Sequence, residues 1–184
     1  MEQTRPVTSA QGIAPFTFSE PALAECRTLL GNYPAEFNKS ALIPILHIAQ
    51  AENGGWLSVP AMNAVADLLQ IQYIEVYEVA TFYSMFNLHP VGRHVLEVCR
   101  TAPCMLRGSD DLLDHIGQRL GIKPGETTAD GLFTLKAVEC LGSCGTAPML
   151  QCGAKYHERL TPEKVDDLIE KLRTAPTRNN YTDR

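Results

Sequence analysis

The chain has 184 residues, of which 45% are hydrophobic and 20% charged, so it is long enough to bury a core and has the composition of an ordinary globular protein. Its formal net charge is −5 at pH 7, which disfavours nucleic acid as the main partner because phosphate binding needs a basic surface. No apolar run approaches the about 20 residues that span a bilayer, and the first twelve residues lack the apolar segment of a signal peptide. The sequence therefore predicts a soluble, intracellular protein with no direct membrane insertion.

Residues 15–90 are predicted to form a small helical bundle. Ser19 precedes a stretch in which apolar residues recur at helical spacing, and Gly31 ends it. Ser40 is predicted to cap a second helix, which ends at the turn AENGGW. Short amphipathic helices joined by brief turns are typical of a bundle.

Two further helices are predicted in this segment, over about 61–69 and 74–86. The second of them carries most of the aromatic residues. These side chains have two possible roles, either the core of the bundle or a docking face for a partner. Helical spacing favours the core for Phe82 and Phe86.

Residues 91–175 are predicted to form a compact α/β domain, and residues 1–14 and 176–184 to be flexible tails. The predicted order is a strand over 95–99, a helix over 109–121 capped by Ser109, a strand over 132–140, a hairpin turning near Gly153, and a helix over 161–172 capped by Thr161. This order is compatible with a reduced thioredoxin-like topology. The whole chain is thus expected to be a helical bundle followed by a mixed α/β domain, in the α+β or α/β class.

Six cysteines are the most informative residues: Cys26, Cys99, Cys104, Cys140, Cys144 and Cys152. An even number of cysteines can indicate disulfides, but that inference belongs to short secreted domains, and nothing here signals secretion. Four of the six form two pairs, C-x4-C and C-x3-C, separated by 35 residues. Each pair lies where a predicted strand runs into a loop. One fold can therefore bring both loops to the same end of the sheet.

A 2Fe–2S cluster needs such an arrangement, because each of its two irons is completed by two thiolates. Glycines such as Gly142 and Gly145 leave backbone N–H groups free to approach the sulfurs, which stabilises an anionic cluster. Arg100 and Arg107 flank the first pair, where they either offset the cluster charge or are solvated surface residues.

Other uses of the cysteines stay open on spacing alone. A structural zinc ion takes the same four thiolates, although zinc knuckles favour a two-residue gap that neither pair has. A thioredoxin-type dithiol needs C-x-x-C, and Rieske ligation needs a histidine within each pair; both are absent. Cys26 is predicted to lie in the helical core, and Cys152 to be a spare thiol in a strand.

Two sequence stretches carry a resemblance to a known family. VYEVATFYSMFNLHPVGRHVLEVCRTAPCMLRG, followed by VECLGSCGTAPMLQ, resembles the 2Fe–2S E subunit of NADH:quinone oxidoreductase, respiratory complex I. The same pattern occurs in diaphorase subunits of NAD-linked hydrogenases and formate dehydrogenases. The likeness covers about residues 15–175.

The resemblance implies a helical domain joined to a thioredoxin-like ferredoxin domain with one 2Fe–2S cluster, ligated by Cys99, Cys104, Cys140 and Cys144. It also implies an electron-transfer subunit without catalytic residues of its own. The partner is then a larger flavoprotein that binds NADH, FMN and a 4Fe–4S cluster, beside other peripheral-arm subunits. This agrees with the lack of G-x-G-x-x-G and G-x-x-x-x-G-K-[ST] nucleotide motifs in the chain.

Three alternatives to the complex I assignment stay open on the sequence. They are a diaphorase subunit of a soluble hydrogenase or formate dehydrogenase, a zinc-stabilised interaction module, and a freestanding thioredoxin-like ferredoxin. The long helical segment argues against the last of these, because a soluble carrier needs no docking domain. The lack of a presequence and the initiating Met1 favour a bacterial cytoplasmic protein over a mature mitochondrial one. The expected location is the cytoplasmic face of the bacterial inner membrane, reached through the complex.

Overall fold

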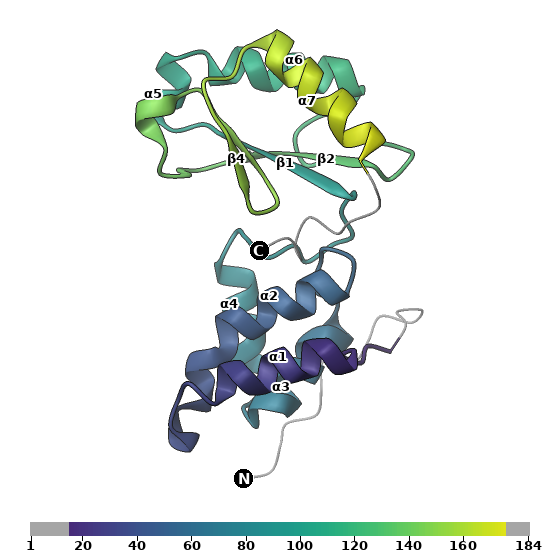
Figure 1. The fold of residues 1–184 in the computed structure, drawn as a ribbon, viewed down its shortest axis with the longest axis vertical. Coiled ribbons are helices and arrows are strands. Elements are labelled where there is room, and N and C mark those ends of the chain that lie inside the picture. Colours follow the sequence, from purple (N-terminus) through teal and green to yellow (C-terminus); the bar gives the residue numbers. More distant parts are fainter. Residues whose placement is uncertain (1–14, 176–184) are drawn as a thin grey trace. The chain divides into compact units, whose positions relative to one another are not determined.

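The computed structural model describes residues 15–175, and the two predicted tails, 1–14 and 176–184, lie outside the described residues. The chain divides into two compact units, with the boundary between Pro90 and Val91 (Figure 1). Within the described residues the first unit is helical, and the second combines helices with a β-sheet. This is the mixed class that the sequence predicts.

The first unit contains the predicted helices and one extra segment of 3-10 helix. In chain order its elements are α1 (Glu20–Leu30), the 3-10 helix η1 (Ala35–Ala41), α2 (Leu42–Glu52), α3 (Val59–Leu69) and α4 (Tyr73–Phe82). Ser19 caps α1 as predicted, because its side chain accepts a hydrogen bond from the backbone N–H of Ala22 at 3.4 Å. The cap predicted at Ser40 is wrong: Ser40 lies inside η1, which runs directly into α2.

Helix α2 supplies the centre of the first unit's core. It buries apolar side chains around most of its surface, and helices α1, α3 and α4 pack on it. It also buries Gln50, whose amide donates to the carbonyl of Met85 at 3.2 Å and accepts from the N–H of Asn87 at 2.7 Å. Asn87 in turn donates to the carbonyl of Gly55 at 2.8 Å. These bonds fasten the segment after α4 to the bundle.

The two phenylalanines that the sequence assigns to the core have different environments. Phe86 is 5% exposed and packs beside the ring of His47, with centroids 5.0 Å apart, which confirms its prediction. Phe82 is 79% exposed, so its prediction is wrong. The helical spacing that relates the two residues stops at Tyr83, whose backbone is extended. A turn then carries Phe86 into the core, while Phe82 stays on the surface at the end of α4.

The second unit is built on a mixed sheet. Its described elements are β1 (His94–Cys99), α5 (Ala102–Leu106), α6 (Ser109–Leu120), β2 (Phe133–Val138), the 3-10 turn η2 (Cys144–Thr146), β3 (Leu150–Cys152), β4 (Lys155–His157) and α7 (Pro162–Thr174). The strand order is β2-β1-β3-β4, with β1 parallel to β2 and the other pairs antiparallel. All predicted elements are present. The short helix α5, which contains the second cysteine of the first pair, is an addition.

Helices α6 and α7 cover one face of this sheet (Figure 1). Leu96 and Val98 of β1 share a buried cluster with side chains of both helices, since alternate residues of a strand point to the same face. Thr161 caps α7 as predicted, accepting from the N–H of Lys164 at 3.4 Å. Ser109 does not cap α6; Gly108 occupies the cap position, and Ser109 is the buried first residue of the helix.

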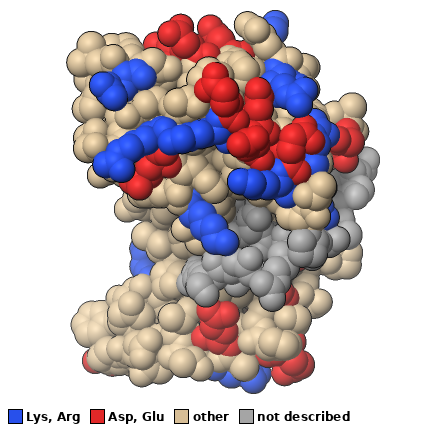
Figure 2. All heavy atoms as spheres, turned by 45° about the horizontal axis from the view of Figure 1, so that its top comes forward, with Lys and Arg blue, Asp and Glu red and all other residues tan. Residues whose placement is uncertain are grey.

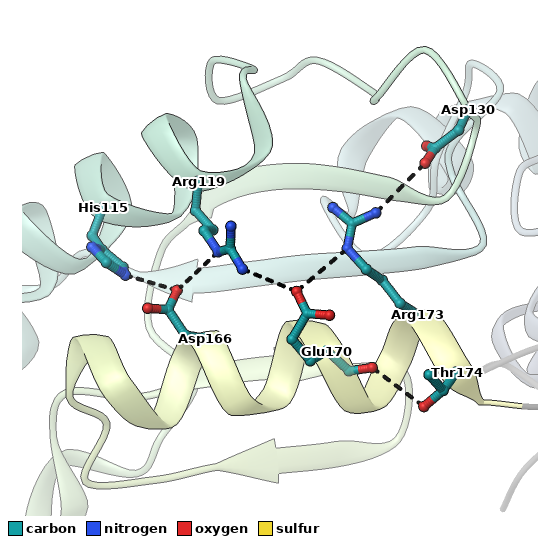
Figure 3. A network of polar contacts seen from close by, with 7 residues as sticks. All are labelled: His115, Arg119, Asp130, Asp166, Glu170, Arg173 and Thr174. Atoms are coloured by element: carbon teal, nitrogen blue, oxygen red, sulfur yellow. Dashed lines mark hydrogen bonds and ion pairs between the residues drawn. The ribbon is translucent and has the colours of Figure 1, made fainter.

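Exposed ion pairs join α6 to α7 (Figure 3). Asp166 lies 3.1 Å from His115 and 3.4 Å from Arg119, and Glu170 lies 3.0 Å from Arg119. Such solvated pairs contribute little stability each, and the packing beneath them holds the helices. In Figure 2 acidic and basic side chains intermingle on the visible face of this unit. Within residues 15–175, no helix is long and apolar enough to cross a membrane.

Candidate metal centre

The first cysteine pair is buried at the end of β1. Cys99 is the last residue of this strand and Cys104 lies in α5, and their exposed fractions are 3% and 2%. The two thiols pack with Ala147 and Met149 in a small cluster of their own, separate from the core under α6 and α7. The fold thus brings the two predicted ligands of this pair together.

Hydrogen-bond donors converge on the sulfur of Cys99. Burial raises the pKa of this thiol, but hydrogen bonds from the side chain and backbone N–H of Thr101, the backbone N–H of Leu141 and the thiol of Cys104 outweigh burial and lower it. The Thr101 hydroxyl lies 3.4 Å from the sulfur. The site therefore stabilises Cys99 as a thiolate, which is the form that binds a metal.

The environment of Cys104 favours its protonated form more than that of Cys99 does. Burial and the neighbouring Cys99 raise its pKa to about 11, and the backbone N–H of Met149 acts in the opposite direction. The charge of Cys144 also raises the pKa of Cys104. The second pair is therefore close enough to the first for its charge to act there.

The second cysteine pair lies in an exposed loop. Cys140 follows β2 and Cys144 begins η2, and both are exposed. The backbone N–H of Gly142, a residue with a left-handed φ of 79°, lies 3.4 Å from the Cys140 sulfur and donates to it. Glycine is suited to this turn because it adopts positive φ without a steric penalty.

The sheet register explains why the two pairs occupy the same end of the second unit. Cys99 pairs with Val138 in the parallel β1–β2 ladder, so Cys140 begins just beyond the same edge. Leu141 then packs against the cluster formed around Cys99 and Cys104. Within residues 15–175, no three or more His, Cys, Asp or Glu side chains form a group placed to hold a metal ion. The four thiols therefore do not form a single group; they lie as one buried pair beside one exposed pair.

Cys26 and Cys152 belong to other parts of the fold, as predicted. Cys26 is fully buried in the core of the first unit, and burial raises its pKa to about 11. Cys152 lies in β3 and belongs to the core under α6 and α7, where burial raises its pKa to about 12. Both are unreactive core thiols on these grounds.

Comparison with known proteins identifies the family of this chain. The model of the family described as Thioredoxin-like [2Fe-2S] ferredoxin matches residues 26–173. The NADH-quinone oxidoreductase E subunit of Rickettsia bellii is 48% identical over 161 residues, which cover 88% of this chain and 96% of that protein. The chain belongs to the thioredoxin-like 2Fe–2S ferredoxin family, among the E subunits of NADH-quinone oxidoreductase.

Further relatives agree with this assignment. The corresponding protein of Rickettsia conorii is also 48% identical, over 87% of this chain and 96% of the relative. A crystal structure of NAD+-reducing [NiFe]-hydrogenase in the air-oxidized state shares 25% identity at a TM-score of 0.64, covering 72% of this chain. This match spans only 23% of that hydrogenase chain. The resemblance found in the sequence, the thioredoxin-like fold and the 2Fe–2S cofactor are confirmed.

The donor set of this ferredoxin-like protein fits a 2Fe–2S cluster. Thiolate sulfur is the ligand that iron–sulfur clusters require, and backbone N–H groups aimed at the sulfurs stabilise their negative charge. Such groups come from Thr101, Leu141, Gly142 and Met149 and serve three of the four predicted ligands. This chemistry suits an anionic cluster better than it suits uncharged buried thiols.

Three features of the site could not be found from the sequence. Arg100 is paired with the carboxylate of Asp110 at 3.2 Å. Arg107, the other arginine that flanks the first pair, lines a cavity together with Cys144. Helix α5 places Cys104 against Cys99, although its five residues include a proline and carry no helical periodicity. Glu158 contacts the loop that bears the second cysteine pair. In the sequence it is only a charged residue that follows a predicted strand.

Proposed function

We propose that Cys99, Cys104, Cys140 and Cys144 hold the 2Fe–2S cluster of this protein, with two thiolates to each iron. The observation that carries this assignment is the buried contact of Cys99 with Cys104, surrounded by N–H donors, beside the loop that bears the second pair. The bound cluster supplies one-electron redox chemistry. The protein's own residues fix the sulfurs, donate hydrogen bonds to them and exclude water from the first pair.

The partner in this proposal is a larger flavoprotein that carries NADH, FMN and a 4Fe–4S cluster, beside other peripheral-arm subunits. The support is an exposed apolar surface at α4 and the turn after it. Its members are Ile74, Tyr77, Phe82, Tyr83 and Met85, each between 37% and 79% exposed. An apolar surface of this kind marks a protein interface more often than it faces water. The first unit thus serves as a docking element.

The location in this proposal is the cytoplasmic face of a bacterial inner membrane, reached through partner subunits. A diaphorase role in an NAD-linked hydrogenase is the second candidate, and the likeness to the hydrogenase structure favours it. The two roles differ in the proteins that surround the chain. Purification of the native complex under mild conditions distinguishes them, because one yields quinone reductase activity and the other hydrogenase or formate dehydrogenase activity.

Serine variants of each cysteine in the full chain test the ligand assignment. We expect Cys99→Ser, Cys104→Ser, Cys140→Ser and Cys144→Ser to impair or abolish assembly, measured as iron and acid-labile sulfide per chain. Cys26→Ser and Cys152→Ser are matched controls and retain wild-type content, because both thiols lie in other cores. Normal iron and sulfide in a predicted ligand variant would overturn the assignment of that residue.

A further inference from the structure

The loop that bears Cys140 and Cys144 has few packing contacts of its own. Both cysteines are exposed, and a Cβ atom added at Gly142 or Gly145 would meet nothing within 4 Å. A cavity of about 380 Å³, lined in part by Arg107, lies against Cys144 and Gly145. By contrast, the first pair is enclosed in its own cluster. Leu141 packs the Cys140 side of the loop on that cluster, so polar contacts must hold the Cys144 side.

Glu158, the residue after β4, contacts this loop on both sides of Cys144. The same carboxylate oxygen of Glu158, Oε1, accepts two hydrogen bonds. One comes from the hydroxyl of Ser143 and the other, at 2.6 Å, from the hydroxyl of Thr146. The two hydroxyl oxygens are themselves 2.7 Å apart. Each hydroxyl has a single proton to donate, and a carboxylate can accept both. The Thr146 hydroxyl also lies 3.0 Å from the carbonyl of Ser143, but its contact with the carboxylate is the shorter one. The pair of hydroxyls is thus tied to one charged acceptor.

The ionised form of Glu158 is the one that this arrangement requires. Hydrogen bonds from Ser143 and Thr146 lower the pKa of Glu158, so the carboxylate carries its charge at neutral pH. Hydrogen bonds to a charged acceptor are stronger than those between neutral groups. Although Glu158 is exposed to solvent, its partners are therefore held more firmly than two neutral surface contacts would be.

The backbone after Glu158 follows the same loop. The N–H of Arg159 donates to the carbonyl of Thr146 at 2.8 Å, and the N–H of Leu160 donates to the carbonyl of Pro148 at 3.0 Å. Arg159 has a φ of 48°, in the left-handed region that residues other than glycine seldom adopt. The segment after β4 thus runs alongside the loop and presents Glu158 to it.

We propose that Glu158 is a positioning residue that fixes the Cys144 side of the loop for cluster binding. This inference rests on the proposed ligand set and extends it to a residue that touches no sulfur. Without the carboxylate, Ser143 and Thr146 lose their shared acceptor. The loop keeps the backbone bonds from Arg159 and Leu160 and, on its Cys140 side, the bond from the Tyr156 hydroxyl to the carbonyl of Leu141. The ligand loop then opens more often, and iron leaves more readily.

Iron release from the holo-protein into an excess of chelator tests the role of Glu158. We expect Glu158→Ala to lose iron about tenfold faster than wild type, a factor near the low end for a single hydrogen bond to a charged group, because this site is exposed. Glu158→Gln keeps an oxygen that accepts a hydrogen bond but loses the charge, so its release rate is expected to lie between those of the wild type and Glu158→Ala. Both substitutions remove the negative charge of Glu158, so each should move the midpoint potential of the cluster to a less negative value in an EPR-monitored titration.

Two control variants separate positioning from a general loss of stability. Glu170→Ala removes an exposed carboxylate of the same unit that pairs with arginines instead of the loop, and it should release iron at the wild-type rate. Ser143→Ala combined with Thr146→Val removes the donors while leaving Glu158 intact. This double variant should release iron at least as fast as Glu158→Ala, because it also removes the contacts of the two hydroxyls with each other and with the carbonyl of Ser143. Adding Glu158→Ala to it should bring no further loss, since the bonds to the carboxylate are already gone.

The possible results for Glu158 differ from those for the ligand assignment. If the wild-type chain holds no iron and sulfide, the ligand assignment and the role of Glu158 both fail. If wild type holds the cluster and Glu158→Ala releases iron at the wild-type rate, the role of Glu158 alone is overturned. It is also overturned if Glu158→Gln releases iron as fast as Glu158→Ala, because the accepting oxygen would then not matter. Far-UV circular dichroism and the thermal midpoint of the iron-free chain should not differ between these variants.

Discussion

The hydrogen bond between Thr101 and Cys99 leads to a quantitative prediction. The Thr101 hydroxyl lies 3.4 Å from the sulfur of Cys99 and, when that sulfur is a thiolate, can only act as the donor. Thr101 stands at the cap position of α5, but its side chain makes no capping bond. The change Thr101→Val is nearly isosteric, so it removes this one contact without uncapping the helix.

The size of the effect follows from how the hydrogen bond responds to reduction. A bond to a charged group contributes about 1.5–3 kcal/mol, and only the part that strengthens when the cluster gains an electron alters the potential. We take that part as about 0.5–1 kcal/mol, given the length of this contact and the weakness of sulfur as an acceptor. For a one-electron couple this corresponds to about 20–45 mV. The donor stabilises the reduced, more negative state, so Thr101→Val should lower the midpoint potential.

A redox titration of the full chain, followed by EPR of the reduced cluster, measures this shift. Thr174→Val on α7 is the matched control, since its hydroxyl bonds to backbone carbonyls of its own helix. Its potential should equal that of the wild type. An unchanged or raised potential in Thr101→Val, with the cluster intact, would show that this hydroxyl does not donate to a ligand sulfur.

Four further predictions concern the rest of the chain. Cys26 and Cys152, with pKa values raised to about 11 and about 12 by burial, should resist alkylation at pH 8 in the native protein and react after denaturation; native labelling seen by mass spectrometry would contradict this. Gln50→Leu removes the acceptor of the buried Asn87 N–H and the donor to the part-buried carbonyl of Met85, and it should lower the free energy of unfolding in urea by about 2–4 kcal/mol; a loss below that range would mean that water replaces the amide. Arg119→Ala should cost less than about 1 kcal/mol in the same assay, and a larger loss would show that the exposed pairs do more than the packing suggests. Phe82→Ser should reduce binding of an apolar dye to the isolated chain without lowering its thermal midpoint, and a drop in the midpoint would indicate that Phe82 is packed.

Much of the fold follows from local patterns in the sequence. The strand ending at Cys99 and the amphipathic helices α6 and α7 carry clear periodicity, and the structure contains them as predicted. Helix ends are less predictable, because capping depends on where the preceding turn stops. Ser40 and Ser109 are both good capping residues, yet Ser40 lies within a 3-10 helix and Gly108 takes the cap position before Ser109.

Sequence patterns fail where a tertiary turn replaces a regular element. Phe82 and Phe86 have helical spacing, but the helix ends between them, and only a three-dimensional structure reveals which one reaches the core. The cysteine spacing predicts the ligands of the proposed metal centre without showing that one pair is buried and the other exposed. Glu158 escapes sequence reasoning for a similar reason: it is 14 residues along the chain from Cys144, and only the return of the backbone after β4 brings it to the loop.

Iron and acid-labile sulfide analysis of the anaerobically purified chain, with EPR after dithionite reduction, tests the presence of the cluster most directly. We expect two irons and two sulfides per chain and a rhombic signal in the reduced state, as for one 2Fe–2S cluster held by four thiolates. Zinc without sulfide in a colourless, EPR-silent protein would contradict this, and would make the chain a zinc-stabilised interaction module instead of an electron carrier.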